Sequence, residues 1–275
     1  MIILLTGKPG VGKSTLIKKV IDSYKDPMLW VMTHELLTEK GNRVGFQANN
    51  SKGQIETVSH KTNIQSAAVI GQNAVDLNAV DRMFGRILNE AISFNGLTIV
   101  DEIGPIQLLS SKFAEALSDA FSHSGQVNLI STIHYNDERL EEFRISKDAW
   151  LFKVDETNRD VLTRLVILCA QHMETINNLS KKQKDQTFTL LNKYIDGAKL
   201  IQVEKLLNNA IHYATNGSVK KSDANWKIDG KHGSYVVQKN DSDYSCTCDL
   251  YNGRGMYTNN GGECSHIQAV GMISL

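Results

Sequence analysis

The sequence predicts an α/β fold with a mainly parallel sheet flanked by helices, then a helical connector and a small ββα module held by a metal. Three observations support this. Apolar runs alternate with amphipathic segments over about the first 155 residues, the following region favours helix, and three cysteines cluster within residues 246–264. We therefore expect three parts, spanning residues 1–167, 168–217 and 218–275.

The strand candidates are continuous apolar runs, a pattern typical of strands that are buried on both faces. These runs are Ile2–Thr6, Met28–Thr33, Leu97–Val100, Val127–Thr132 and Trp150–Val154. Between them, the apolar residues of Asp76–Ser93 and Ser111–Ser124 recur at helical spacing. Strands that alternate with helices in this way pair in parallel, so we expect helices on both faces of the sheet.

The composition is that of an ordinary globular chain. Apolar residues make up 41% and charged residues 22%, and the formal net charge is zero, so no global field draws the chain to nucleic acid or membrane. The apolar start has no basic leader, and no apolar stretch reaches the ~20 residues that span a bilayer. We therefore expect a soluble, cytoplasmic protein with no membrane partner.

A glycine-rich segment follows the first strand candidate. It consists of Gly7, Lys8, Pro9, Gly10, Val11, Gly12, Lys13 and Ser14, followed by Thr15, and it matches the pattern G-x-x-x-x-G-K-[ST]. Such glycines let backbone N–H groups converge on phosphate oxygens, and the N-terminus of the following helix adds partial positive charge. We expect this segment to bind a nucleotide, with Lys13 on the β- and γ-phosphates and the Ser14 hydroxyl on Mg²⁺.

An acidic pair ends the apolar run Leu97–Val100. Because parallel strands end at one edge of a sheet, we expect Asp101 to lie beside the phosphate loop as a second magnesium ligand. Glu102 is expected to orient and polarise the attacking water. Either Thr132 or His134, at the end of a neighbouring strand, is a candidate to sense the γ-phosphate. Candidate arginines for stabilising transition-state charge are Arg43, Arg82, Arg86, Arg139 and Arg144.

Five stretches of residues 1–167 carry a family resemblance. They are Gly7–Leu16, Gly41–Phe46, Asp101–Leu109, Ser131–His134 and Asn158–Asp160. In their order and spacing the chain resembles the cancer-related nucleoside-triphosphatase family, which includes thermophile enzymes. The resemblance implies Mg²⁺-dependent hydrolysis of ATP, GTP and other nucleoside triphosphates to diphosphate and phosphate. It also implies that the Arg43–Phe46 loop lies near the site.

Two alternatives stay open beside hydrolysis. A phosphate loop also suits a nucleoside or nucleotide kinase, and a slow triphosphatase suits an adaptor or switch whose main role is binding. Glu102 directly after Asp101 favours water as the nucleophile. The sequence shows neither a clear acceptor pocket nor an arginine-rich lid.

The cysteine cluster has the spacing of a metal site. Cys246 and Cys248 face one side of a predicted strand, and Cys264 and His266 flank the start of a predicted helix, Ser265–Ile273. Three thiolates and an imidazole suit Zn²⁺ in a closed structural site. Such a short segment has a small core, so a bound metal would stabilise its fold.

A second resemblance covers residues 200–275. The Cys-x-Cys and Cys-x-His pairs, with Trp226–Ile228, Tyr235–Val237 and Ile267–Val270, resemble the SWIM zinc finger. The resemblance implies a ββα zinc module that binds DNA or protein, and RNA is a further candidate partner. It also implies that the module takes no part in catalysis. The remaining cysteine, Cys169, is predicted to be a small buried hydrophobic residue.

Overall fold

The computed structural model describes residues 1–178, 181–195, 208–210, 212–214, 216–222, 225–240, 243–248 and 264–273. These residues form two compact units, Met1–Met173 and Glu174–Leu275, and each is described by itself. The sequence boundaries at residues 167 and 217 stay a prediction. Much of the predicted connector, residues 196–207, lies outside the described residues.

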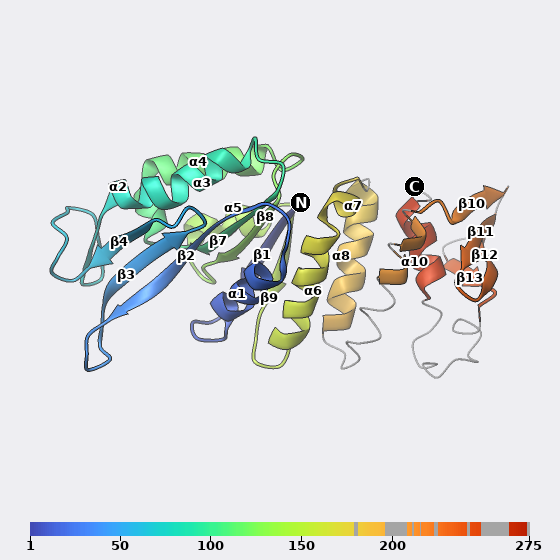
Figure 1. Cartoon of the computed structure of the whole chain (residues 1–275), viewed down its shortest axis with the longest axis horizontal. Helices are drawn as coiled ribbons and strands as arrows, with labels where there is room; N and C mark the ends of the chain where they lie inside the picture. Colours follow the sequence, from blue (N-terminus) through green and yellow to red (C-terminus); the bar gives the residue numbers. More distant parts are fainter. Residues whose placement is uncertain are drawn as a thin grey trace. The chain divides into compact units, whose positions relative to one another are not determined.

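A nine-stranded mixed sheet forms the centre of the N-terminal unit, in the order β5-β6-β4-β3-β2-β7-β8-β1-β9 (Figure 1). Strand β1 (Ile2–Thr6) lies between β8 (Leu129–Ile133) and β9 (Ala149–Lys153) and is parallel to both. Strand β7 (Leu97–Ile103) is likewise parallel to β8 and β2 (Met28–Leu37). These five strands correspond to the five apolar runs, so the predicted parallel sheet is confirmed.

Four strands that the sequence analysis missed extend the sheet beyond β2. They are β3 (Arg43–Asn50), β4 (Ile55–His60), β5 (Val69–Ile70) and β6 (Asn73–Val75), and they pair antiparallel. Their side chains are mostly half-buried or exposed, and β5 and β6 are only two and three residues long. Continuous apolar runs therefore do not mark them, and the sheet is parallel only on the side of β2 that carries β1.

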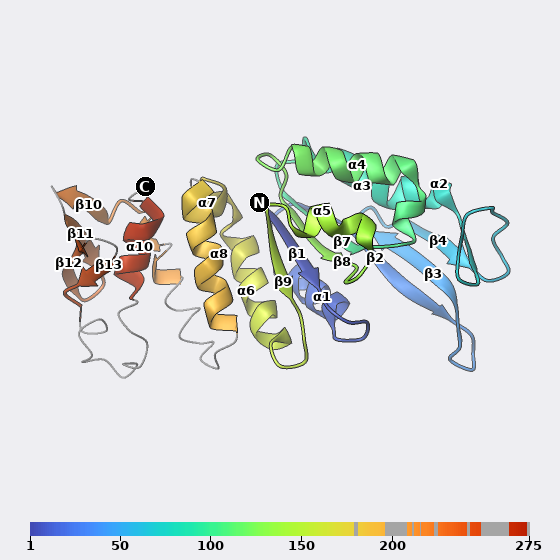
Figure 2. The same cartoon turned by 180° about the vertical axis from the view of Figure 1, so that it is seen from behind.

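Helices cover both faces of this sheet (Figures 1 and 2). Helices α1 (Lys13–Ser23) and α6 (Arg159–Gln171) pack together on one side, and α3 (Arg86–Ala91) and α4 (Ser111–Ser122) pack together on the other. Alternate side chains of β1 point to opposite faces of the sheet. Ile2 and Leu4 belong to the core that α3 and α4 cover, whereas Ile3 and Leu5 do not. The prediction of helices on both faces is confirmed.

The predicted helix Asp76–Ser93 is one helical run with three parts. Helix α2 (Leu77–Val80) continues into a π-helical turn, Asp81–Gly85, and then into α3. The Asp76 carboxylate accepts a hydrogen bond from the Ala79 N–H, which satisfies a free donor of the first turn. In the middle of the run the ring of Phe84 meets that of Phe113 edge to face at 6.4 Å, and both are fully buried. Burying such a ring stabilises the fold by about 1.5–3 kcal/mol.

The remaining elements of the N-terminal unit are short. They are the 3₁₀ turns Gln107–Leu109 and Glu138–Leu140 and helix α5 (Glu141–Arg144). The first of these turns follows β7 directly and forms part of the cavity wall described below.

The C-terminal unit has a smaller sheet and helices of its own. Helix α7 (Met173–Asn177) joins the two units in sequence and α8 (Lys181–Ile195) follows it. The antiparallel strands are β10 (Val219–Ser222), β11 (Asn225–Gly230), β12 (Gly233–Asn240) and β13 (Asp243–Cys246), before α10 (Ser265–Ile273). Helix α10 has the predicted ends, whereas the sheet has two strands more than a ββα module. None of the described helices is both long and apolar enough to cross a membrane.

Candidate nucleotide and metal sites

The phosphate loop connects β1 to α1 at the carboxyl edge of the parallel strands. Gly10 and Gly12 have φ of 78° and 102°, which L side chains rarely adopt. A Cβ at Gly12 would lie 2.5 Å from Arg159 Cδ, and one at Gly7 would lie 2.4 Å from the Val154 carbonyl oxygen. The spaced glycines of the sequence pattern are thus required by the backbone and by its close neighbours.

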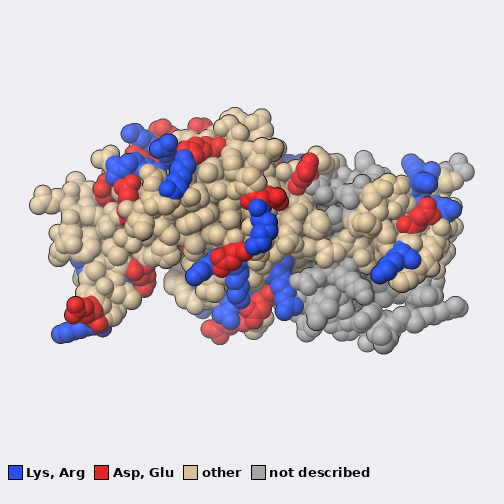
Figure 3. Space-filling model, viewed as in Figure 1, with Lys and Arg blue, Asp and Glu red and all other residues tan. Residues whose placement is uncertain are grey.

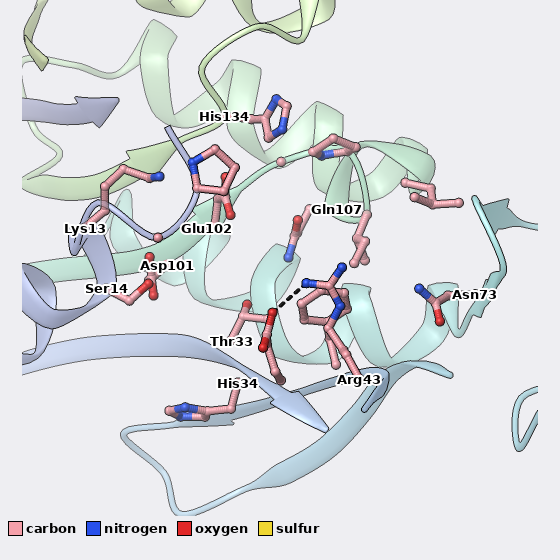
Figure 4. Close-up of a pocket in the computed structure, with 18 of the residues that line it drawn as sticks. Lys13, Ser14, Thr33, His34, Arg43, Asn73, Asp101, Glu102, Gln107 and His134 are labelled. Carbon is pink, nitrogen blue, oxygen red and sulfur yellow. Dashed lines mark hydrogen bonds and ion pairs between the residues drawn. The ribbon is translucent and has the colours of Figure 1, made fainter. Parts of the chain in front are cut away.

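Lys13 lies across this loop. Its Nζ donates hydrogen bonds to the carbonyl oxygens of Gly7 at 2.8 Å and of Lys8 at 3.2 Å. Figure 4 shows the ammonium reaching toward the cavity that Glu102 also lines. A cation in this position is available to phosphate oxygens that the loop N–H groups bind.

Asp101 is held rigidly at the end of β7. Its side chain is 2% exposed, and its Oδ1 accepts a hydrogen bond from Thr132 Oγ1 at 2.5 Å. Burial raises the pKa of this carboxyl, while hydrogen bonds from Thr132 and Ser14 and the charge of Lys13 oppose the rise. The structure therefore brings Asp101 and Ser14 together, and Thr132 supports Asp101 rather than facing the cavity.

Glu102 is the carboxylate that faces the cavity. The Asp101–Glu102 peptide is cis, and the pairing of β7 with β8 shifts register between Val100 and Ile103. Burial raises the pKa of Glu102 to about 6, with Asp101 adding to the rise and Lys13 opposing it. A carboxylate with a pKa in this range is suited to accept a proton near neutral pH.

The other polar candidates differ in where they lie. His134 lines the cavity, and its Nδ1 is buried without a hydrogen-bond partner among the described residues. Arg43 also lines the cavity and forms an ion pair with Glu35 at 2.5 Å. The four other candidate arginines do not line the cavity and form ion pairs, Arg82 with Glu56, Arg86 with Glu90, Arg139 with Asp137 and Arg144 with Glu141. Arg144 also donates a hydrogen bond to the carbonyl oxygen of His134 at 2.8 Å. The sequence analysis did not select Arg159, whose side chain packs on Gly12.

A cavity of about 1060 Å³ opens beside the phosphate loop (Figure 4). Its near end is lined by Lys13, Ser14, Asp101 and Glu102. Thr33 of β2, one residue beyond the partner of Asp101, lines the middle of the cavity, and its far end is lined by Glu35 of β2, Arg43 and Phe46 of β3, Asn73 of β6, and Gln107 of the turn after β7. The far end therefore depends on the antiparallel strands that the sequence analysis missed.

Strand, glycine-rich loop, helix and acidic strand end meet at one cavity, which is the arrangement of a P-loop nucleotide-binding protein. A family model described as NTPase matches residues 2–167. The chain belongs to this nucleoside-triphosphatase family, which includes the THEP1 proteins. The family model ends before the cysteine cluster.

Relatives of this family are similar over the same part of the chain. Nucleoside-triphosphatase THEP1 of Thermotoga petrophila is 33% identical over 179 residues, covering 65% of this chain and 97% of the relative. The human cancer-related nucleoside-triphosphatase is 29% identical, covering 62% and 96%. The crystal structure of THEP1 from Aquifex aeolicus superposes with a TM-score of 0.55 at 28% identity, covering 62% of this chain and 99% of that one.

The predicted metal ligands come together in the C-terminal unit. The three cysteine sulfurs and one ring nitrogen of His266 all lie within 4.8 Å of one another, and all four side chains are buried. His266 Nδ1 is 3.7 Å from Cys246 Sγ, so this nitrogen faces the cluster. Ligand atoms about 2.3 Å from a tetrahedral zinc ion lie about 3.8 Å apart, which is close to the separation of Cys246 Sγ and His266 Nδ1, and the 4.8 Å limit on the other pairs leaves space for an ion among them.

Surrounding groups hold this cluster in place. The His266 ring is stacked between Tyr235 at 4.2 Å and Tyr213 at 5.1 Å. A hydrogen bond with Cys248 and burial raise the pKa of Cys246 to about 11, while a hydrogen bond with Cys264 opposes the rise. A cation at the centre would favour the thiolates instead. The SWIM assignment stays a prediction, whereas Cys169 is buried as expected, and burial raises its pKa to about 12.

Proposed function

We propose that the N-terminal unit hydrolyses the bond between the β- and γ-phosphates of nucleoside triphosphates, with Mg²⁺ as cofactor. The observation that carries the proposal is that a loop-bound ammonium, a fixed carboxylate and a carboxylate of raised pKa line one cavity. These groups are Lys13, Asp101 and Glu102. The loop amides and Lys13 bind the phosphates, and the helix N-terminus of α1 adds its partial positive charge.

The Ser14 hydroxyl and the Asp101 carboxylate suit a magnesium ion. Both are oxygen donors, they lie beside one another at the near end of the cavity, and Mg²⁺ prefers such ligands together with substrate phosphates. When bound, the ion supplies charge that neutralises the phosphate oxygens. Thr132 keeps Asp101 in this orientation.

Glu102 acts on the water that attacks the γ-phosphorus. The water oxygen forms a bond to phosphorus, the bond from phosphorus to the bridging oxygen breaks, and the diphosphate leaves. The water proton passes to the Glu102 carboxylate. Only Glu102 of the two adjacent carboxylates is free for this role, because Asp101 accepts hydrogen bonds from two hydroxyls.

Phosphate release tests this function. The full chain is incubated with Mg²⁺ and ATP, GTP, CTP or UTP, and compared with Lys13→Ala and with Lys18→Ala, which removes an exposed ammonium from the same helix. We expect release with every nucleotide, none with Lys13→Ala, and unchanged release with Lys18→Ala. Equal release by the Lys13 variant and the wild-type chain would contradict the assignment of the loop.

We further propose that the C-terminal unit holds one structural zinc ion and binds nucleic acid. Cys246, Cys248, Cys264 and His266 supply four ligand atoms, the number that a closed tetrahedral zinc site takes, so they would leave no open position for catalysis. Lys220 and Lys227 lie directly opposite each other on exposed positions of β10 and β11. The Asp229 carboxylate lies 3.9 Å from the Lys220 ammonium and offsets part of their repulsion, and a polyanion would offset the remainder.

The surface charge of the C-terminal unit supports nucleic-acid binding, and a binding assay tests it. Figure 3 shows more basic than acidic side chains around strands β10–β13. Fluorescence anisotropy with labelled DNA and RNA should detect binding that weakens with salt and with the pair of changes Lys220→Glu and Lys227→Glu. Absence of binding at low salt would leave a protein as the partner and overturn the nucleic-acid proposal.

A further inference from the structure

We propose that the far end of the cavity is a second substrate site, and that it binds a nucleoside whose free hydroxyl accepts the γ-phosphoryl group in place of water. The inference goes beyond hydrolysis, which uses only the near end. Four features of the cavity support it: its position, its size, its unpaired polar atoms and the chemistry of its wall.

Position follows from the strand order. Strands β7, β8, β1 and β9 lie side by side, so Glu102 at the end of β7 and the turn before Arg159 lie on opposite sides of the phosphate loop. In phosphoryl transfer the attacking and leaving oxygens lie on opposite sides of the phosphorus. With the γ-phosphate at Glu102, the triphosphate's own nucleoside extends toward Arg159. The nucleophile then approaches from the cavity.

The cavity is much larger than one attacking water requires. Its volume is about 1060 Å³, whereas a water molecule takes about 30 Å³ of liquid and typical small-molecule sites measure roughly 300–1,000 Å³. The terminal phosphate, at the near end, fills a small part of it. Figure 4 shows Glu102 and Asn73 toward opposite ends of the cavity, with Gln107 and Arg43 between them in this view, and the far part has room for a second molecule.

Two polar atoms of residues that line the cavity point to a ligand, one at the far end and one on β2 beside the acidic pair. Thr33 Oγ1 and Asn73 Oδ1 are buried, and neither has a hydrogen-bond partner within the described ranges. Both residues line the cavity. A buried polar atom that lacks a partner costs about 1–3 kcal/mol, and folded proteins contain few of them. A ligand at the far end that carries an N–H or O–H donor would satisfy Asn73 Oδ1.

The chemistry of the wall favours a nucleoside. The Phe46 ring offers an aromatic face, with the Arg43 guanidinium 5.0 Å from its centroid. Asn73 and Gln107 bring amide groups, which both donate and accept hydrogen bonds, to the same space. A flat base can stack on the Phe46 ring, and the polar edge of the base can form hydrogen bonds with the Asn73 and Gln107 amides. Because Glu35 already neutralises Arg43, the site does not require an acceptor that carries phosphate.

The transfer balances with the groups present. The hydroxyl oxygen of the nucleoside forms a bond to the γ-phosphorus, and the bond from phosphorus to the bridging oxygen of the β-phosphate breaks. The hydroxyl proton passes to the Glu102 carboxylate. The products are a nucleoside diphosphate and a nucleoside monophosphate, and hydrolysis is the same step with water when the far end is empty.

The proposal is tested by following the γ-phosphate of ATP to its product. The full chain is incubated with Mg²⁺ and ATP carrying label in the γ-phosphate, with and without adenosine, guanosine, cytidine, uridine, inosine or thymidine. Chromatography separates labelled nucleoside monophosphate from inorganic phosphate. We expect at least one nucleoside to become labelled. In the same reaction, the release of labelled inorganic phosphate should fall. Inorganic phosphate as the labelled product with every nucleoside would overturn the proposal.

Variants of the far end show where the acceptor binds. Asn73→Ala removes one unpaired acceptor, and Phe46→Leu keeps apolar bulk but removes the ring face. Each should lower kcat/KM for the nucleoside about tenfold, the scale of one lost polar contact. Phosphate release without a nucleoside should stay within about twofold, as should both activities of Asn95→Ala, an exposed asparagine outside the cavity.

Two results with these variants would contradict the second site. Unchanged transfer would place the acceptor elsewhere. An equal fall in transfer and in phosphate release would mean that the far end binds the triphosphate itself. Loss of phosphate release by the wild-type chain without a nucleoside would count against the hydrolytic mechanism instead.

Discussion

The nucleotide site and the cysteine cluster differ in their relation to the hydrophobic core. The nucleotide site lies at the edge of a large sheet whose core, including Phe84 and Phe113, is complete without it. The cysteine cluster is part of the core itself, since Cys246, Cys248 and Cys264 pack with Trp226 and Val237. Residues at the edge can be changed for chemistry at little cost in folding, whereas residues in the cluster cannot.

The largest expected effect is the unfolding of the C-terminal unit, without loss of activity in the N-terminal unit, when the metal is removed. Cys264→Ala or a strong chelator should release one zinc ion per chain, and the unit should become sensitive to protease because structural zinc contributes about 10–16 kcal/mol of apparent binding energy in small fingers. Phosphate release should persist. Elemental analysis and limited proteolysis measure the first two results.

A buried cysteine outside the cluster provides the control for that change. Cys169→Ala should keep both the zinc and the protease resistance, because Cys169 lies in α6 of the other unit. Purified wild-type chain without zinc, or loss of hydrolysis with both units intact, would contradict the division between the two sites.

The next effect falls on the nucleotide site alone. Glu102→Gln keeps the shape of the side chain but removes the group that accepts the proton, so turnover should fall ~10²-fold or more. Binding of Mg²⁺-nucleotide and the thermal unfolding temperature should hardly change. Stopped-time phosphate release and calorimetry measure the two. Near-full turnover would exclude Glu102 as the proton acceptor and turn attention to His134.

A smaller effect should follow from the support of Asp101. Thr132→Val removes the hydroxyl that donates to Asp101, so we expect turnover to fall by about tenfold, the lower end of the range for groups that orient metal ligands, and more Mg²⁺ to be needed. Thr98→Val is the matched control. Thr98 Oγ1 is buried and has no hydrogen-bond partner in the described part of the chain, so its loss should leave kinetics unchanged.

The smallest effect concerns the fold that carries the nucleotide site. Ser110 Oγ accepts a hydrogen bond from the Phe113 N–H at the start of α4 and donates one to the Asp81 carboxylate, so Ser110→Ala should destabilise the N-terminal unit by about 1 kcal/mol or somewhat more. Differential scanning calorimetry should show a melting temperature lower by roughly 2–4 °C. The exposed neighbouring change Ser111→Ala should have less effect, and an equal shift in both would argue against the cap.

Sequence patterns singled out much of the candidate nucleotide site because its parts are local. A glycine-rich loop needs particular residues at fixed spacing, and a strand buried on both faces is apolar throughout, so Gly7–Ser14 and the end of β7 stand out. The Cys-x-Cys and Cys-x-His pairs likewise name all four members of the cluster, because adjacent ligands on one strand and one helix turn must keep such spacing.

The tertiary structure alone decided the rest. Strands β3 to β6 lack an apolar run, so the far wall of the cavity, with Phe46 and Asn73, could not be foreseen from periodicity. Local sequence also did not show that Thr132 donates to Asp101 or that Arg159 packs on Gly12. These contacts join residues that lie far apart along the chain, and only the pairing of strands across the sheet brings them together.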